Sequence, residues 1–479
     1  MVNYKSQSSR DSILSLSIAR DVGGVSHLDS QERFYIAGKD SSHIVRKSAS
    51  SNMAQSRDTH SFKVIIIGAG LSGSLLANGL IHASIPVTVY ERSEENFSSG
   101  GYQIHLGESA LIGLRACMSE AEIASVVAKF GRAGGRKGQA AMLRHKDFSL
   151  LLDLKAFPDY TKSAPIKRGI LRDALAAPLA QAGVVRYEKR FVRYEIFDKG
   201  GQERVRVVFD DGSTDECDLL VGADGSSSKV NQQLGLNNLT EIKTHVQLLI
   251  KQELPTETLL TLGREFTSGP VLAFADNKTF YFSAYVPEGG DKSSFDEFSS
   301  CSVGGAFPTE TAPADLKDRS PAEKWNFVSK GFAEWAPQFH QALEVVRHSD
   351  FMVYPARTSS RPTKDWRQKV KSEHDPTKGT PRVWLLGDAM HAMFPYSTLL
   401  TTWTQRGQGG NQSMRDAAMA LPLLVQLAER ARSGELSDKY VEDACETFED
   451  EMIPRTFEWV QKSGGKETIQ FCETRASLT

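Results

Sequence analysis

A glycine-rich segment between a short apolar run and an amphipathic stretch has the residue types needed to hold a dinucleotide. The β-branched run 63–67 predicts a strand, and the helical spacing from Leu71 to His82 predicts a helix. Gly68 allows a tight turn between them, Gly70 lets a pyrophosphate approach the backbone, and Gly73 lets the helix pack close to the strand. The N–H groups and positive dipole end of that helix then face the phosphates. The segment is therefore predicted to bind a dinucleotide.

A carboxylate stands at the end of the next predicted strand, Val87 to Tyr90. Glu91 follows Gly73 by 18 residues, close to the interval at which an acidic side chain accepts hydrogen bonds from ribose hydroxyls. Arg92 and Leu71 are included with it among the predicted cofactor-binding residues. Strand, helix, second strand and acidic terminus together make a chance glycine-rich turn a poor alternative. Glu91 by itself does not distinguish NAD from FAD.

Four further segments follow in a definite order. They are RGILRDAL at 168–175, DLLVGADGSSSKV at 218–230, LLGDAMH at 385–391, and GQGGN at 407–411 with RDA at 415–417. Together with the glycine-rich segment that precedes it in the sequence, this series resembles the class A, single-component FAD-dependent monooxygenases, the para-hydroxybenzoate and salicylate hydroxylase group. The resemblance covers about residues 62–464 and is specific because all four segments occur in order.

The resemblance implies roles for several residues in holding FAD non-covalently. Arg168 would contact the cofactor, Asp224 would contact both FAD and the nicotinamide cofactor, and Asp388 would contact the ribityl hydroxyls. The backbone N–H groups of Gly409, Gly410 and Asn411 would lie near the N1–C2=O edge of the flavin. Negative charge develops at that edge when the flavin is reduced. Three alternatives stay open: Arg168 as a surface residue at a helix start, Asp224 as a turn aspartate, and Asp388 as a helix N-cap.

The resemblance also implies a reaction. NADPH or NADH reduces the flavin, dioxygen gives a C4a-hydroperoxide, and one oxygen atom hydroxylates or epoxidises an aromatic or polycyclic natural product, as is common in fungal secondary metabolism. The cofactor carries this chemistry, so no catalytic residue and no metal ligand is predicted. His391 and His105 lie near cofactor motifs, but a packing role is favoured for both.

Two departures from the family pattern bear on activity. Asn231 stands where relatives carry the arginine that ends the second motif, so a cofactor contact is lost or passes to Lys229. Residues 397–405 insert nine residues in the loop expected beside the flavin ring. A non-catalytic or damaged flavin-binding relative is therefore the main alternative. A flavin halogenase is disfavoured because Trp335 and Trp459 are isolated rather than part of a WxWxIP segment. A Baeyer–Villiger enzyme is disfavoured because that class carries two GxGxxG fingerprints and this sequence has only one.

The rest of the 479-residue chain predicts an α/β fold: a discontinuous Rossmann-like FAD domain, an inserted mixed β-sheet substrate domain and a C-terminal helix. The expected divisions are a disordered leader at 1–61, FAD-binding parts at 62–240 and 356–430, the substrate domain at 241–355 and a helical segment at 431–479. The natural protein is hypothesised to begin at Met53. The alternative interpretation of the leader is a weak mitochondrial targeting signal. Within the substrate domain, Asn277 and Lys278 are predicted to form a hairpin turn. About half of its strand aromatics should face a pocket; these are Phe274, Phe280, Tyr281, Phe282 and Tyr285.

Composition limits the partners. The 57 basic and 59 acidic residues nearly balance, which argues against nucleic acid and anionic membranes. No stretch is predicted to cross a membrane. The five cysteines are dispersed, which argues against disulfides and zinc and favours buried thiols in the cytoplasm. A monomer or homodimer acting on a small molecule is expected.

Overall fold

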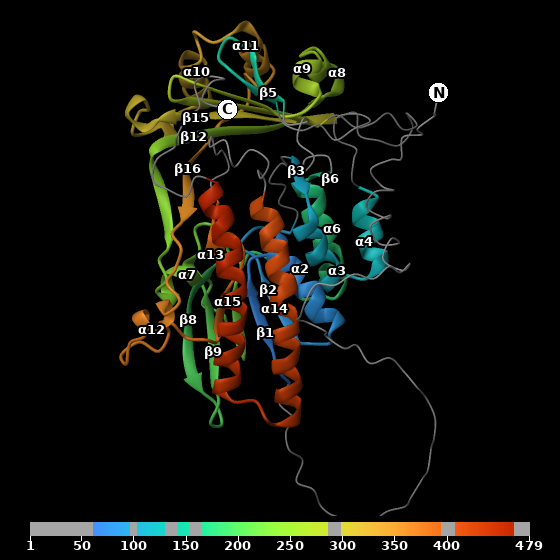
Figure 1. Cartoon of the computed structure of the whole chain (residues 1–479), viewed down its shortest axis with the longest axis vertical. Helices are drawn as coiled ribbons and strands as arrows, with labels where there is room; N and C mark the ends of the chain where they lie inside the picture. The colour runs from blue at the N-terminus through green and yellow to red at the C-terminus, as the bar shows by residue number, and fades with distance from the viewer. Residues whose placement is uncertain are drawn as a thin grey trace, which may run out of the picture. The chain divides into compact units, whose positions relative to one another are not determined.

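The computed structural model describes most of the chain from residue 61 onward. The described ranges are 61–95, 103–129, 142–153, 164–285, 298–393 and 408–463. The predicted leader, the candidate start at Met53 and the 397–405 segment lie outside these ranges, apart from residue 61. The predicted α/β fold is confirmed within them (Figure 1).

A five-stranded parallel sheet forms the centre of the part that contains the glycine-rich segment. Its order is β17 (Val383–Leu385), β11 (Leu219–Gly222), β1 (Val64–Ile67), β2 (Val87–Tyr90) and β7 (Val185–Arg186). The residues of β1 and β11 are fully buried apolar side chains and one glycine, as expected for strands covered on both faces. The predicted β-α-β unit is confirmed, with α2 at Leu71–His82 between β1 and β2.

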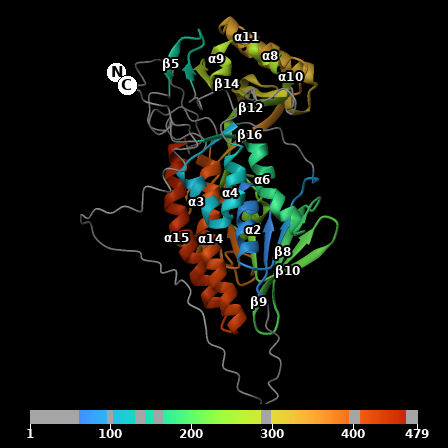
Figure 2. The same ribbon diagram turned by 90° about the vertical axis from the view of Figure 1, so that its right-hand side faces the viewer.

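Long helices cover one side of this sheet. The helix α14 (Gln408–Ser433) packs against α2, α3 (Glu108–Cys117) and α15 (Asp438–Lys462). Figure 2 shows α14 and α15 side by side over much of their length. A Cβ atom on Gly113 of α3 would lie 2.3 Å from the carbonyl oxygen of Met414, so glycine lets α3 and α14 approach closely. The predicted helix near 410–430 and the C-terminal helix are confirmed.

Smaller elements complete this part of the chain. A three-stranded antiparallel sheet contains β8 (Phe191–Asp198), β9 (Glu203–Phe209) and β10 (Thr214–Cys217). The strands β3 (Gln103–Leu106) and β6 (Ala164–Lys167) pair with each other, and β6 continues into α6 (Arg168–Gln181). The short helices are α4 (Glu120–Val127), α7 (Lys229–Leu234), α12 (Trp366–Val370) and α13 (Asp388–His391).

A seven-stranded mixed sheet contains most of the strands of the segment predicted as the substrate domain. Its order is β16 (Met352–Ser359), β12 (Leu239–Pro255), β15 (Phe298–Pro308), β14 (Lys278–Tyr285), β13 (Val271–Ala275), β4 (Met142–Arg144) and β5 (Leu150–Asp153). The strands β4 and β5 come from the segment assigned by sequence to the first FAD-binding part, and β16 ends beyond residue 355. The predicted divisions therefore do not coincide with sheet membership.

Four helices cover one face of the seven-stranded sheet. They are α8 (Thr256–Leu260), α9 (Arg264–Thr267), α10 (Pro321–Gly331) and α11 (Pro337–Glu344). Alternate residues of the strands, including Leu248, Ile250, Phe280 and Phe282, form one apolar core with these helices. The opposite face is directed toward α6 and α13 (Figure 1).

The hairpin between β13 and β14 corrects one sequence prediction. Ala275 pairs with Lys278, so Lys278 belongs to the strand and the turn residues are Asp276 and Asn277. Their φ angles are 52° and 57°, as in a type I′ turn, which both residue types accept. The turn was therefore predicted one residue too late.

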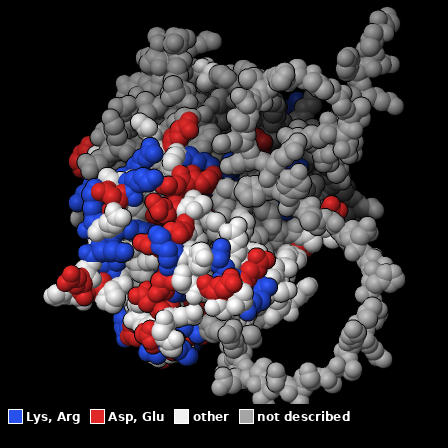
Figure 3. Space-filling model, turned by 60° about the horizontal axis from the view of Figure 1, so that its bottom comes forward, with Lys and Arg blue, Asp and Glu red and all other residues white. Residues whose placement is uncertain are grey.

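The surface mixes both charges. On the face shown in Figure 3, acidic and basic side chains alternate. Four described cysteines, Cys117, Cys217, Cys301 and Cys445, are free thiols and buried, as predicted. Among the described helices, none is long and apolar enough to span a membrane.

Candidate functional site

The register of the parallel sheet brings three sequence motifs to one edge. Ile67 lies beside Tyr90 on one side and Gly222 on the other, and Gly222 lies beside Leu385. The residues that follow these strand ends include Gly68, Glu91, Asp224 and Asp388. Ligands of open parallel α/β sheets bind outside the carboxyl ends of the strands. The sheet therefore positions the predicted cofactor residues around one place.

The three glycines of the fingerprint have different surroundings. Gly68 has a φ of 106°, and a Cβ atom there would lie 2.4 Å from the carbonyl oxygen of Ala223. A Cβ atom on Gly73 would lie 2.1 Å from the carbonyl oxygen of Gly68. At Gly70 a Cβ atom would meet nothing within 4 Å. The fold itself requires glycine at the first and third positions, whereas the second leaves open space for a ligand.

The N-terminus of α2 faces that open space. Its N-cap residue, Gly70, makes no side-chain capping hydrogen bond, and the first turn contains no acidic residue. Glu91 lies beside it: the Ala69 and Ser93 N–H groups each donate to its carboxylate at 2.9 Å. A carboxylate has about four acceptor positions, so two hydrogen bonds leave capacity for ribose hydroxyls. These features fit a pyrophosphate joined to a ribose.

The third motif forms a turn that also requires glycine. Gly387 has a φ of 59°, and a Cβ atom there would lie 2.9 Å from Cβ of Ser413. This turn exposes Asp388 at the start of α13. The surrounding protein nevertheless raises the pKa of Asp388 by desolvation, against the opposing charges of His391 and Arg168. A carboxylate that solvent can reach but protein surrounds is expected at the floor of a recess.

The predicted residues of α14 lie next to this carboxylate. A Cβ atom on Gly409 would lie 3.8 Å from Oδ1 of Asp388, and one on Gly410 would lie 3.6 Å from Cδ1 of Leu71. The side chain of Asn411 accepts a hydrogen bond of 2.7 Å from the Gly107 N–H. The N-terminus of α14, the start of α2 and Asp388 are therefore adjacent, while the Asn411 side chain joins α14 to the start of α3.

A buried network behind Asp388 was not predicted from the sequence. Asp416 of α14 accepts hydrogen bonds from the Gly387 N–H at 2.9 Å, His391 Nε2 at 2.6 Å and Arg455 Nη2 at 2.9 Å. Burial opposes ionisation of Asp416, but His391 and Arg455 outweigh it and lower its pKa. The packing role favoured for His391 is consistent with this geometry. The side chain of His105, in β3, lies outside the described part.

Asp224 and Asn231 form hydrogen bonds at the start of α7 and from within it. Oδ2 of Asp224 accepts from the Lys229 N–H at 2.8 Å, while its Oδ1 is buried with no partner among the described residues. Burial raises the pKa of Asp224 above its usual range. Asn231 donates to the Ala389 carbonyl at 2.8 Å and to Asn238. The residue that replaces the family arginine thus joins α7 to α13.

A cavity of about 450 Å³ opens beside the fingerprint. Gly68, Gly70 and Glu91 line it, together with Asp224 and predicted Arg92, Arg168 and Lys229. Sequence reasoning missed three more cations on its wall, Arg172, Lys189 and Arg190. Arg172 belongs to α6, whereas Lys189 and Arg190 directly precede β8, so only the folded chain brings them together. Cations around a helix N-terminus fit a diphosphate, so the cavity fits the nucleotide portion of FAD.

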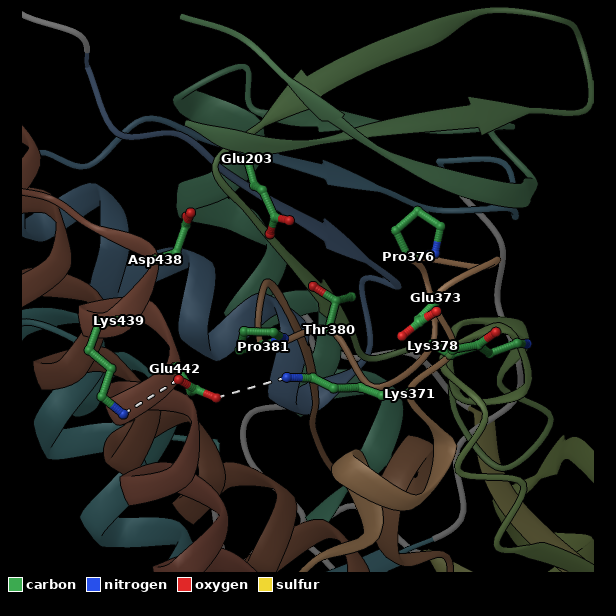
Figure 4. A pocket seen from close by; sticks show the side chains of 11 residues that line it. Glu203, Lys371, Glu373, Pro376, Lys378, Thr380, Pro381, Asp438, Lys439 and Glu442 are labelled. Carbon is green, nitrogen blue, oxygen red and sulfur yellow. Dashed lines mark hydrogen bonds and ion pairs between the residues drawn. The ribbon is translucent and has the colours of Figure 1, made fainter. Parts of the chain in front are cut away.

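A second cavity, of about 490 Å³, contains none of the predicted cofactor residues (Figure 4). Lysines and carboxylates line it together, and several form ion pairs with one another. Lys371 and Lys439 both approach Glu442, at 3.9 and 3.4 Å. These charges compensate each other, and the dinucleotide features lie elsewhere, so the first cavity is the candidate site.

Comparisons with known proteins agree with this geometry. A family model described as FAD binding domain matches residues 61–453. The chloroplastic zeaxanthin epoxidase of Nicotiana plumbaginifolia is 27% identical over 381 residues, which cover 78% of this chain and 50% of that protein. The FAD-dependent monooxygenase sor5 of Hypocrea jecorina is 25% identical over 394 residues, covering 78% of this chain and 76% of that one. The chain spans about half the length of the zeaxanthin epoxidases it matches.

A solved structure shares the fold. PqsL of P. aeruginosa, in complex with 2-aminobenzoylacetate, superposes with a TM-score of 0.59 at 19% identity, over 87% of this chain and 98% of that one. The family match covers most of the chain and all the motifs gathered at the edge of the parallel sheet. The chain therefore belongs to the FAD binding domain family.

Proposed function

We propose that this protein is a single-component FAD-dependent monooxygenase. It uses NADPH or NADH and dioxygen to hydroxylate or epoxidise an aromatic or polycyclic natural product. The observation that carries the proposal is the meeting of the fingerprint, Asp224, Asp388 and the N-terminus of α14 at one sheet edge, beneath a second sheet. The relatives support it, since those named above are an epoxidase and a monooxygenase.

The chain's own residues bind and orient the cofactor in this proposal. The α2 N-terminus receives the pyrophosphate, Glu91 accepts from the ribose, and Arg168 and Asp388 contact the part of FAD nearer the ring. FAD held by these residues would supply the redox chemistry that couples oxidation of the nicotinamide cofactor to transfer of one atom of dioxygen to the substrate, the other atom leaving as water. The N-terminus of α14, at Gly409 and Gly410, stabilises negative charge on the reduced ring. The seven-stranded sheet covers the ring and excludes water.

The cellular setting belongs to the same proposal. The four described cysteines are free thiols rather than disulfides, which fits a reducing, cytoplasmic location. The substrate is a small molecule, and the protein acts as a monomer or homodimer. Divisions of the chain into FAD-binding and substrate-binding parts follow the two large sheets, with β4 and β5 joining the latter.

Binding and turnover are tested in two steps. Protein purified and incubated with FAD should retain the visible flavin absorbance after gel filtration; protein that stays colourless would refute FAD binding. Flavin-loaded protein should then oxidise NADPH or NADH with oxygen uptake that rises when a hydroxylated aromatic compound is added. Flavin that neither donor reduces, with every compound tried, would favour the alternative of a non-catalytic relative.

The 397–405 insertion is tested separately. A chain lacking these nine residues should bind FAD with an affinity within a few fold of the full chain, because the cofactor residues named above lie outside the deleted segment. Oxygen uptake by the two proteins is then compared under the same conditions. A loss of FAD binding on deletion would show that the insertion is part of the cofactor site.

A further inference from the structure

Two buried asparagines connect the short helix that begins with Asp388 to the base of the seven-stranded sheet. Asn231, in α7, is fully buried, and Asn238, directly before β12, is 4% exposed. Asn231 Nδ2 donates a hydrogen bond of 2.9 Å to Asn238 Oδ1, so the two side chains form a pair. The sequence marks Asn231 only as the replacement of the family arginine and gives Asn238 no role. The function of the pair therefore follows from what else it contacts.

Each asparagine of the pair also donates to a backbone carbonyl of α13. Asn231 Nδ2 donates to Ala389 at 2.8 Å, and Asn238 Nδ2 donates to Met390 at 2.9 Å. The last carbonyl groups of a helix have no partners within it, and α13 has only four residues. The two side chains therefore complete the end of the helix whose first residue is Asp388.

Asn238 also joins the pair to the seven-stranded sheet. Its Nδ2 donates to the Ser360 carbonyl at 2.9 Å, and the Ser360 N–H donates to the Asn238 carbonyl at 2.9 Å. These two residues directly flank the register pair Leu239 and Ser359, where β12 begins and β16 ends. The helix α13 lies against both strands (Figure 1). Asn238 therefore fixes α13 to the place where the chain enters and leaves this sheet.

The hydrogen bonds of the pair define the orientation of both amides. Each Nδ2 uses both of its hydrogens, and three of the four acceptors are backbone carbonyls. Turning either amide over would place its oxygen against a carbonyl oxygen. Oδ1 of Asn231 is buried and has no partner among the described residues, which is unfavourable for stability. The stability of α7 alone therefore does not account for an asparagine at this position.

The other end of α13 is held by a different contact. The Gly387 N–H, in the turn before Asp388, donates to Asp416 of α14 at 2.9 Å. The asparagine pair holds the carbonyl end of α13, so both ends of this helix are fixed. A carboxylate that binds a ligand depends on such support, because hydrogen bonds weaken steeply when their geometry is poor.

We propose that Asn231 and Asn238 are positioning residues, which hold Asp388 at one place relative to the seven-stranded sheet. This inference rests on the proposed function, in which Asp388 binds the ribityl chain of FAD and the sheet covers the flavin ring. The pair acts on the cofactor through Asp388 and aligns these two parts of the site. The loss of the family arginine at position 231 is thus accompanied by an indirect connection to the cofactor.

The test is a double-mutant cycle on the full-length protein, with FAD titration as the measurement. Asn231→Ala should raise the Kd for FAD by about 2- to 10-fold, the range of one neutral hydrogen bond. In an Asp388→Asn background the same substitution should change the Kd by less than about twofold, because the carboxylate that it positions is absent. Asn238→Ala should show the same pattern. A residue that serves only the stability of the fold would have equal effects in both backgrounds.

A second measurement reports the sheet side of the connection. At saturating FAD, the visible circular dichroism of the bound flavin should differ between Asn238→Ala and the unaltered protein, because the ring would lie differently against the sheet. Asn231→Leu is close in volume to asparagine but lacks its donors. It takes the place of Asn231→Ala in the cycle if the smaller side chain leaves a cavity that prevents folding.

Gln233→Ala is the matched control in the same helix. The Gln233 side chain accepts from the Tyr194 N–H at 2.9 Å and donates to the Tyr194 carbonyl at 2.7 Å, so its two hydrogen bonds join α7 to β8 and not to α13. The control should lower the temperature of thermal unfolding. It should change the Kd for FAD by no more than about twofold and leave the circular dichroism of the flavin unchanged.

Three outcomes would overturn the proposal. Equal changes of the Kd in the two backgrounds would make the asparagines purely structural. A loss of FAD affinity in Gln233→Ala as large as that in Asn231→Ala would assign the effect to α7 as a whole. An unchanged Kd in Asp388→Asn alone would leave the pair no carboxylate to position. Failure of the unaltered protein to bind FAD is detected before any variant is compared, and contradicts the proposed function instead.

Discussion

His391 Nε2 donates a hydrogen bond of 2.6 Å to the carboxylate of Asp416, and neither side chain reaches solvent. The same carboxylate accepts from the Gly387 N–H and from Arg455 of α15. One ionised group therefore joins α13, α14, α15 and the turn that presents Asp388. Because Gly387 has a left-handed conformation, this turn depends on contacts that hold it. The C-terminal helix thus supports the cofactor recess although it contributes no predicted cofactor residue.

Replacing the central acceptor should damage stability and cofactor binding together. Asp416→Asn leaves the buried Arg455 with Glu451 as its remaining ionic partner, and removing one member of a buried pair costs up to about 3 to 5 kcal/mol. FAD affinity should also fall because the Gly387 turn loses its acceptor. Denaturant unfolding and FAD titration measure the two effects. Asp443→Asn, on the outside of α15, is the control and should change stability by no more than about 0.5 kcal/mol.

The same pair predicts a dependence of stability on pH. The folded protein lowers the pKa of Asp416, so its stabilising effect is complete above the unfolded value of about 4 and is lost as the pH falls through the folded value. The difference in unfolding free energy between the unaltered protein and Asp416→Asn should be constant near neutral pH and shrink below about pH 4. A difference that stays constant into the acid range would show that the charge of Asp416 is not the source.

Alanine substitutions at Gly70 and Gly73 should have different effects on stability and on FAD affinity. Gly70 has a φ of −75° and open space around it, so Gly70→Ala should fold with nearly unchanged stability. Its FAD affinity should fall at least about tenfold because the methyl group occupies the path of the pyrophosphate. Gly73→Ala instead meets the Gly68 carbonyl and should lose about 1 to 3 kcal/mol of stability. Equal behaviour of the two variants in unfolding and FAD titration would contradict this assignment.

Local patterns predicted most of the parallel-sheet part. The β-branched run ending at Ile67, the helix from Leu71 and the strand before Glu91 depend on neighbouring residues, and the structure reproduces them. The hairpin turn at Asp276 was misplaced by one residue because two adjacent polar pairs have similar turn propensity. The membership of β4 in the seven-stranded sheet depends on its pairing with β13, more than 120 residues away, which no local pattern records.

The site could be predicted only where a motif marks it. Gly68, Glu91 and Asp388 stand in recognisable strings and the fold brings them to one edge. Asp416 stands in the RDA string but was given no role, and Arg455 was missed because an arginine on a separate helix looks like a surface residue in the sequence. Their contact depends on how α14 and α15 pack. The roles of the predicted residues toward FAD remain part of the proposal.

The buried thiols should be inert in the folded protein. Burial raises the pKa of Cys117, Cys301 and Cys445 to about 12, and that of Cys217 above its usual range. Because the thiolate is the reactive form, iodoacetamide at about pH 8 should leave these four unlabelled. Peptide mass spectrometry after native and denatured labelling provides the measurement. Labelling of any of the four before unfolding would reveal local opening or a reactive site.

Asp388→Asn should weaken FAD binding without destabilising the FAD-free protein. Desolvation raises the pKa of Asp388, so its ionised form is less favourable in the folded state than in the unfolded chain. That penalty is complete above the raised folded pKa, shrinks as the pH falls below it, and is absent below the unfolded pKa. The neutral variant should therefore be as stable as the unaltered protein or more stable near neutral pH, with the difference vanishing in acid.

FAD affinity should fall about tenfold or more, since a charged acceptor for the ribityl hydroxyls is lost. Thermal unfolding with and without FAD measures both effects, and a variant that loses stability without FAD would show that Asp388 serves the fold rather than the cofactor.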